Sequence, residues 1–259
     1  MDFLAHWFAA VPSYTAPLLI ACLGLIINER AGVLNLGAEG MMVCGALAGA
    51  AISLNTGLPS IGIIAAMLAG ALIATVFAFM TIILRANQVI SGLIIVALGA
   101  GITGVLGGSI INTPLPGFYN LDWGVMSDVP FIGPIIFNQN ALTYLAFVLA
   151  GLIWYFLFKT TTGLRLRAVG EDPATADASG VNVITVRILA VVTGGALCGV
   201  AGGYLSLASS FIWVEGMTGG RGWIAIGLVI FARWNPKLAV IGALLFGAIE
   251  ALIPRIQIT

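Results

Sequence analysis

The chain has 259 residues, of which 60% are hydrophobic and only 8% are charged. A soluble domain of this length would carry about a quarter charged residues, so the composition excludes a soluble fold and indicates a polytopic membrane protein. The ten basic and ten acidic side chains cancel, which gives no general attraction to nucleic acid. We expect residues 1–259 to form one all-α domain, a bundle of transmembrane helices that pack closely at some of the 34 glycines.

Apolar runs separated by polar breaks predict about eight membrane segments, because a full span needs roughly 20 apolar residues. Ahead of the first run, residues 2–14 mix aromatic and polar side chains and are expected to lie at the membrane interface. The run 223–232 is too short to span, so it is either half a helix or continuous with the glycine-rich break before it, 210–222. The predicted runs cover approximately residues 17–27 with their flanks, 43–54, 61–84, 89–111, 142–158, 188–209, 223–232 and 238–253.

Two long loops fix the expected orientation. The segment 159–187 is the longest polar stretch and contains several cations, whereas the proline-rich segment 112–140 has no Lys or Arg. If 159–187 is cytoplasmic, strict alternation of the spans puts 112–140 outside. The same alternation brings most of the remaining cations to the cytoplasmic side, as the positive-inside rule requires: Arg30, Arg85, Arg233 and Lys237.

A short helix with both ends encoded lies inside the 159–187 loop. Asp172 can accept hydrogen bonds from the first helical N–H groups, and Pro173 suits the first helical position. Ala176 favours the helix and Gly180 supplies a left-handed residue to end it. This helix, with Glu171 just before it, is either a knob on which another protein docks or part of an ordered linker.

Polar residues near apolar depth are the candidates for a solute path, because such residues are costly in a membrane. Asn35 and Glu39 are four residues apart, so in a helix they would share one face. They either line the path or hydrogen-bond to neighbouring helices. A second group surrounds the glycines of residues 216–222, and there Glu215 and Arg221 are alternatively a structural ion pair. The path candidates are Asn35, Glu39, Gln88, Ser91, Glu215, Arg221 and Trp223.

Motifs of enzymes are missing from the sequence. The chain has a single histidine, His6, so we predict no catalytic triad within the spans and no multi-histidine metal site. Its only lysines, Lys159 and Lys237, do not follow a glycine, so no phosphate-binding loop for ATP is present. If transport is driven by ATP, the ATPase must be another polypeptide, and this chain is expected to need no cofactor of its own.

Three stretches resemble one family of membrane proteins. Residues 28–42, NERAGVLNLGAEGMM, resemble the opening signature of bacterial ABC-importer permeases of the branched-chain amino acid, ribose and nucleoside type. Residues 163–183 are similar to that family's coupling loop, with Glu171, Ala176 and Gly180 at its Glu-Ala-Ala-Gly pattern. Residues 216–236 resemble the nucleoside and simple-sugar branch of the family.

The resemblance implies a permease subunit in the bacterial plasma (inner) membrane that imports nucleosides or simple sugars. It implies several partners: ATPase subunits that carry ATP and Mg²⁺, a second permease subunit (a sister protein or a second copy), and an extracytoplasmic solute-binding protein. Residues 172–180 would transmit the ATPase motion, and 112–140 would meet the binding protein. Two alternatives stay open at this point: a branched-chain amino acid permease, and an ATP-independent carrier or channel that binds a coupling ion at Asn35 and Glu39.

Overall fold

A computed structural model describes residues 2–121, 123–124, 127 and 133–256 of the chain. The described residues form helices without a β-strand, which confirms the all-α prediction. The α-helices are α1 (Asp2–Arg30), α2 (Ala38–Thr56), α3 (Pro59–Ala78), α4 (Gln88–Leu106), α5 (Ala141–Lys159), α6 (Thr161–Glu171), α7 (Pro173–Ala178), α8 (Val183–Tyr204), α9 (Arg221–Phe231) and α10 (Pro236–Ile256). Short 3₁₀ or π turns are η1 (Phe79–Ile83), η2 (Gly107–Ile110), η4 (Gly133–Phe137) and η5 (Leu205–Ser210).

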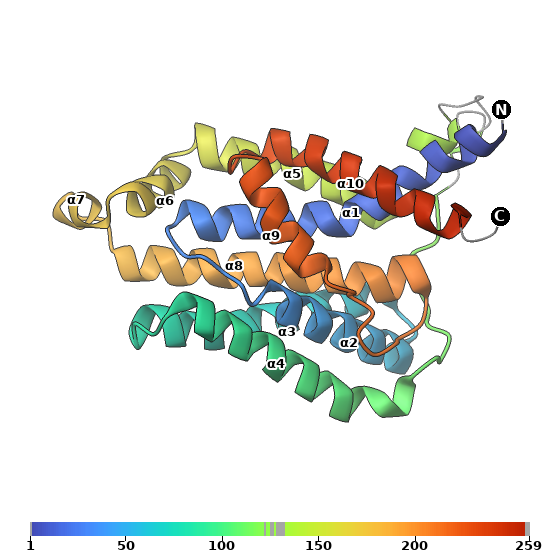
Figure 1. Cartoon of the computed structure of the whole chain (residues 1–259), viewed down its shortest axis with the longest axis horizontal. Coiled ribbons are helices and arrows are strands. Elements are labelled where there is room, and N and C mark those ends of the chain that lie inside the picture. Colours follow the sequence, from blue (N-terminus) through green and yellow to red (C-terminus); the bar gives the residue numbers. More distant parts are fainter. Residues whose placement is uncertain (1, 122, 125–126, 128–132, 257–259) are drawn as a thin grey trace.

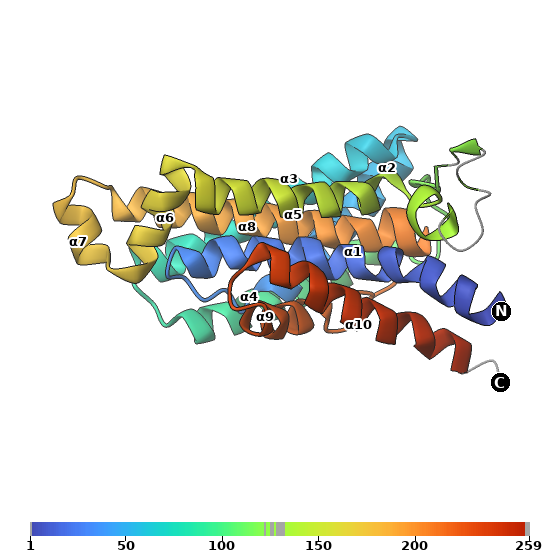
Figure 2. The same cartoon turned by 90° about the horizontal axis from the view of Figure 1, so that it is seen from above.

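Seven of the described helices are long and apolar enough to cross a membrane. The shorter apolar helix α9 completes the eight predicted segments. The long helices run along the long axis of the molecule, with α6 and α7 projecting from one end and both chain termini at the other (Figures 1 and 2). We call the first of these the α7 end and the second the opposite end.

Helices α2, α3 and α8 pack with their backbones in contact. A methyl group added to Gly70 of α3 would lie 2.7 Å from both the N and the Cα atom of Gly199 in α8. A methyl group on Gly45 of α2 would meet the same Gly199 backbone from the other side, 2.5 Å from its Cα atom. Since lipid provides no hydrophobic driving force between helices, this close approach gains the van der Waals contact that holds the three together.

Helix α1 is longer than the sequence indicated. We expected residues 2–14 to lie at the interface, but the helix continues from Asp2 to Arg30 through Pro12 and Pro17. A transmembrane helix tolerates prolines where neighbouring groups satisfy the freed backbone. The span is largely buried inside the bundle, so α1 is a central helix.

The 159–187 loop contains one more helix than predicted. Thr160 begins α6 by accepting a hydrogen bond from the backbone N–H of Gly163 through its hydroxyl, at 3.0 Å. Asn182 caps α8 in the same way, so that helix begins at Val183 and not near residue 188. The polar composition of the loop led us to predict no helix at either place. The capping side chains of Thr160 and Asn182 explain why both helices begin where they do.

Two non-helical segments lead into the middle of the bundle. Residues 31–37 run inward from the end of α1 to the start of α2, and residues 211–220 run inward from the opposite end to the start of α9 (Figure 1). Helix α9 has 11 residues and is therefore about 16 Å long, half of a bilayer core. The predicted broken helices are confirmed, and the starts of α2 and α9 meet at mid-depth.

The described part of the 112–140 loop is tied to the segment after α8. The backbone N–H of Leu115 donates to the carbonyl of Phe211 at 2.8 Å, and that of Asn112 donates to the carbonyl of Trp213 at 3.0 Å. Trp213 is fully buried beneath this contact. The loop is thus connected directly to the chain that leads to α9.

Candidate functional site

A cavity of about 240 Å³ lies between α2, α4 and the segment that precedes α9. Its apolar lining, Val43, Val96 and Ala100, comes from α2 and α4, and its polar side chains come from these two helices and from the segment before α9. The polar side chains that line it are those of Glu39, Thr103, Glu215 and Thr218, beside the backbone of Gly216, Gly219 and Gly220. The cavity therefore offers two carboxylates and two hydroxyls to whatever enters it.

The Glu39 carboxylate joins the beginnings of two helices. It stands in the first turn of α2, and its two oxygens accept hydrogen bonds from the backbone N–H groups of Gly220, at 2.9 Å, and Gly222, at 2.6 Å. These N–H groups begin α9 and would otherwise have no partner. Because a helix N-terminus carries partial positive charge, two of them stabilise this partly buried carboxylate. Glu39 thereby fixes α9 to α2.

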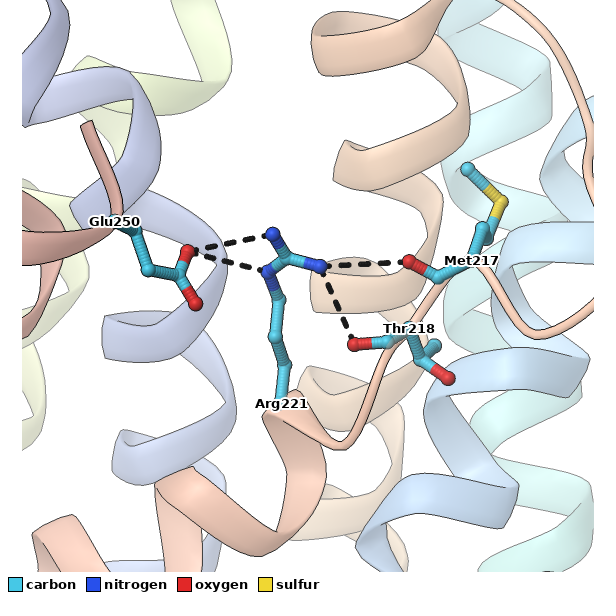
Figure 3. Close-up of polar contacts among 4 residues, drawn as sticks. All are labelled: Met217, Thr218, Arg221 and Glu250. Atoms are coloured by element: carbon cyan, nitrogen blue, oxygen red, sulfur yellow. Dashed lines mark hydrogen bonds and ion pairs between the residues drawn. The ribbon is translucent and has the colours of Figure 1, made fainter. Parts of the chain in front are cut away.

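Arg221 holds the start of α9 on its other side. Its Nη2 lies 3.3 Å from Oε2 of Glu250 in α10, and its Nη1 donates to the carbonyls of Met217 and Thr218 at 3.4 and 3.3 Å. Figure 3 shows the guanidinium group between these partners. An ion pair at this depth is expected to be costly to break, since it would leave a charge unpaired.

The predicted pair between Glu215 and Arg221 is wrong. Glu215 faces α4, where a methyl group on Gly104 would lie 3.3 Å from its Oε1, while Arg221 turns toward α10. The glycine-rich turns between the two residues direct them to different helices. Sequence reasoning missed Glu250, although a lone acid inside the apolar run 238–253 was an available signal.

Two of the other path candidates support the inward segment 31–37. Asn35 is fully buried, and its Oδ1 accepts a hydrogen bond from the N–H of Gly37 at 3.0 Å. The Gln88 side chain accepts one from the N–H of Leu34 at 2.8 Å. The expectation that Asn35 and Glu39 share a helix face is wrong, because α2 begins only at Ala38.

The structure therefore brings Glu39 and Glu215 together and leaves the other candidates outside the cavity lining. Ser91 is buried in α4, and Trp223 is half-exposed on α9. The five candidates outside the lining are Asn35, Gln88, Ser91, Arg221 and Trp223. A role of any of the seven in passing a solute stays a prediction.

Helix α7 has the two ends that the sequence predicted. Asp172 Oδ1 accepts hydrogen bonds from the N–H groups of Ala174 and Thr175 at 3.0 and 3.2 Å, and Pro173 occupies the first position. Gly180 has a φ of +82°, and the N–H of residue 181 bonds back to the carbonyl of Ala176 at 3.0 Å. Most side chains of α7 are exposed at the tip of the molecule (Figure 1). Glu171 ends α6 beside it and is also exposed.

Removing the cap of α7 is expected to loosen this helix. Hydrogen bonds from the hydroxyl and the N–H of Thr175 hold the pKa of Asp172 below its ordinary value. Since the folded pKa is lowered, the cap stabilises α7 at neutral pH and is lost as pH falls through that lowered pKa. In Asp172→Ala, we expect amide hydrogen exchange at residues 174–176 to be about fivefold faster at neutral pH.

The exchange should be measured by mass spectrometry on the membrane-reconstituted chain, with Asp177→Ala as the matched control. Asp177 is an exposed acid of the same helix that caps nothing. Equal exchange in the two variants would contradict the capping role. The difference between wild type and Asp172→Ala should also disappear at acidic pH.

Comparison with known proteins shows the family to which this chain belongs. The sequence model of one protein family, described as branched-chain amino acid transport system / permease component, matches residues 8–258. A provisionally named glucose ABC transporter permease protein, TsgC13, of Haloferax volcanii is 43% identical over 99% of this chain and 79% of its own length. The nucleoside ABC transporter permease protein NupC of Lactococcus lactis is 37% identical over 92% of this chain and 79% of its own.

The guanosine ABC transporter permease protein NupQ of Bacillus subtilis is 36% identical over 97% of this chain and 84% of its own. No solved structure matches the chain. The family match covers nearly all of the chain, including the three stretches on which the resemblance depended. The chain therefore belongs to the family of ABC-importer permease components and is a multi-pass permease subunit of the plasma membrane.

Proposed function

We propose that this permease subunit moves nucleosides or simple sugars. The observation that carries the proposal is that relatives matching almost the whole chain are named for glucose, nucleoside and guanosine transport. The chemistry of the cavity agrees with such solutes, because the carboxylates of Glu39 and Glu215 can accept hydrogen bonds from sugar hydroxyls. The carboxylate of a branched-chain amino acid would instead meet two like charges there.

The α7 end is proposed to be cytoplasmic. Eight of the ten Lys and Arg residues stand on segments at that end. This asymmetry is what the positive-inside rule predicts for a cytoplasmic face, and the 112–140 loop would then lie outside. The eight residues are Arg30, Arg85, Lys159, Arg165, Arg167, Arg187, Arg233 and Lys237.

Helix α7 is proposed to receive the ATPase subunits, on which ATP and Mg²⁺ would be bound. A depression of about 600 Å³ lies between α7 and the start of α8 and gives this surface relief for docking. The candidate coupling residues on and beside it are Glu171, Asp172, Pro173, Ala176 and Gly180. ATP hydrolysis would occur entirely on those partners, so this subunit would not itself be an enzyme.

A route from α7 to the cavity supports this coupling. Helix α6 carries α7 and lies against the end of α1, where a methyl group on Gly170 would be 3.1 Å from the N atom of Gly32. Arg187 also donates from Nε to the carbonyl of Ala31 at 3.2 Å. Residues 31–37 lead directly to Glu39. A displacement of α6 thus acts on the segment that positions the cavity, and ATP would favour one arrangement through its differential affinity for the two.

The open side of the cavity supports the presence of a second permease subunit. Glu215 is exposed, so the cavity opens at the surface of this chain, and a sister permease or a second copy would complete its wall. A solute-binding protein outside the membrane would dock on the opposite end. There the 112–140 loop is hydrogen-bonded to the chain that leads into the cavity.

Replacing Gly180 tests the coupling. An isoleucine cannot adopt a φ of +82° without strain, so Gly180→Ile should distort the end of α7. We expect ATP-dependent uptake of radiolabelled guanosine or glucose into vesicles containing the assembled transporter to be lost, while membrane insertion stays normal. Gly57→Ile is the matched control: Gly57 has a φ of +72° and open space around it, but lies at the opposite end.

Unchanged uptake by Gly180→Ile would count against docking at α7. Uptake that persists without ATP would instead support the carrier alternative. Competition among unlabelled nucleosides, hexoses and branched-chain amino acids in the same vesicles then separates the solute classes. Inhibition by leucine alone would overturn the proposed solute.

A further inference from the structure

An apolar groove of about 520 Å³ opens on the side of the bundle near the α7 end. Its floor is formed by the last turns of α1 and α5 and the first turns of α8, with Ile27, Ile153 and Ala190 all nearly buried. Leu189 on its edge is 61% exposed. The groove lies where these spans end, so we expect its mouth to lie at the level of the lipid headgroups.

Helix α6 places a cation at the mouth of this groove. Thr162, Arg165 and Leu166 stand three and four residues apart, so they share one face of the helix. Leu166 is buried in the groove, whereas Thr162 and Arg165 are exposed at its rim. No acidic residue lines the groove, and Arg165 makes no hydrogen bond or ion pair with another residue in the part of the chain that the structure describes.

We infer that this groove binds an anionic phospholipid from the membrane leaflet at the α7 end. An acyl chain would lie along the apolar floor, and the phosphate would bind Arg165. A guanidinium group binds phosphate oxygens through paired hydrogen bonds, and the hydroxyl of Thr162 adds a further donor. Basic pockets between transmembrane helices at the cytoplasmic boundary have the chemistry that anionic headgroups require. The inference depends on the membrane placement of the chain and not on its solute or its ATPase.

The two parts of the groove fit different parts of one molecule. A soluble phosphate compound would use Arg165 but would leave the apolar floor empty. A neutral phospholipid would fill the floor but would leave the guanidinium group without its anion. Of these three ligands, the anionic phospholipid alone satisfies both parts, which is why we assign the groove to it.

Lipid retention tests the assignment. The purified permease would be reconstituted into nanodiscs of equal phosphatidylglycerol and phosphatidylcholine, then released into detergent, and its retained lipids counted by native mass spectrometry. We expect phosphatidylglycerol to be retained preferentially. Arg165→Gln should lower that retention about tenfold, the factor expected for losing one charge-assisted hydrogen bond. Lys159→Gln is the matched control, since Lys159 is a cation at the same boundary outside the groove.

A second variant tests whether the apolar floor of the groove holds an acyl chain. Ala190→Phe fills the groove and should lower retention of both lipids, whereas Arg165→Gln changes an exposed residue and leaves the fold intact. Retention of phosphatidylglycerol by Arg165→Gln at the wild-type level would overturn the inference. So would displacement of the lipid by an equal concentration of soluble glycerol phosphate.

The assembled transporter provides the last check. In native membranes, a thiol introduced by Leu189→Cys reports what covers the groove, because the three native cysteines are buried. Cross-linking of this thiol to a photoreactive phosphatidylglycerol is the expected result. Cross-linking to another protein, with no lipid retained, would mean that a subunit covers the groove and would overturn the inference.

Discussion

A Gly70→Ala variant is expected to be strongly destabilised. The new methyl group would lie 2.7 Å from the N and Cα atoms of Gly199, and backbone atoms cannot rotate away as a side chain can. Helices α3 and α8 would have to separate, and the contact of α2 with the same glycine would be lost with them. We expect a cost of about 3 kcal/mol, the upper part of the range for overpacked cores.

Gly151→Ala is the matched control for this experiment. Gly151 lies in α5, is exposed, and has open space where the methyl group would be. An alanine there should stabilise the helix by about 0.5–1 kcal/mol, so the two variants should differ in sign. The measurement is the midpoint of thermal loss of the monodisperse peak in size-exclusion chromatography. Equal midpoints would mean that α3 and α8 are not packed as described.

Replacing Glu39 with alanine is expected to lower uptake strongly. The N–H groups of Gly220 and Gly222 would lose the only acceptors that they have among the described residues, at mid-depth of the membrane. An unsatisfied buried donor costs about 1–3 kcal/mol, so releasing two should free the start of α9 and lower uptake by at least about tenfold. The thermal midpoint should fall as well, because the start of α9 would lose two hydrogen bonds to α2.

Two further variants distinguish the role of Glu39 in holding α9 against α2 from a role of the cavity carboxylates in contacting the solute. Glu39→Gln keeps one acceptor oxygen, so it should lie between wild type and alanine in both stability and uptake. Glu215→Ala removes the other carboxylate of the cavity, which makes no hydrogen bond to α9 among the described residues, so stability should not change. If Glu39→Ala were as stable as wild type, α9 would not depend on the carboxylate.

The sequence predicted α7 well because its signals are local. Asp172, Pro173 and Gly180 specify the two ends of one short helix within nine residues, and no distant contact is needed for them to act. Helix α6 was not predicted, although Thr160 caps it in the same manner. Its place depends on the close approach of Gly170 to the end of α1, which is a tertiary contact that no local pattern reveals.

The cavity illustrates a different limit. Hydropathy identified Glu39, Glu215 and Arg221 as unusual, because charges stand out in apolar surroundings wherever they point. Which partner each charge takes depends on how the inward segments fold back. Arg221 therefore pairs with a residue 29 positions further on, and Glu39 reaches across more than 180 positions to α9. Seeing these pairs required the arrangement of α2, α9 and α10 in space.

The glycine packing of α2, α3 and α8 also determines how this protein responds to temperature. A soluble core is held by the release of water, which gives unfolding a large heat capacity and weakens the core on cooling. The contact at Gly70 and Gly199 exchanges lipid contacts for backbone contacts and involves no water. Its heat-capacity contribution is therefore small, so this part of the transporter keeps its cohesion in the cold, where water-driven cores lose theirs.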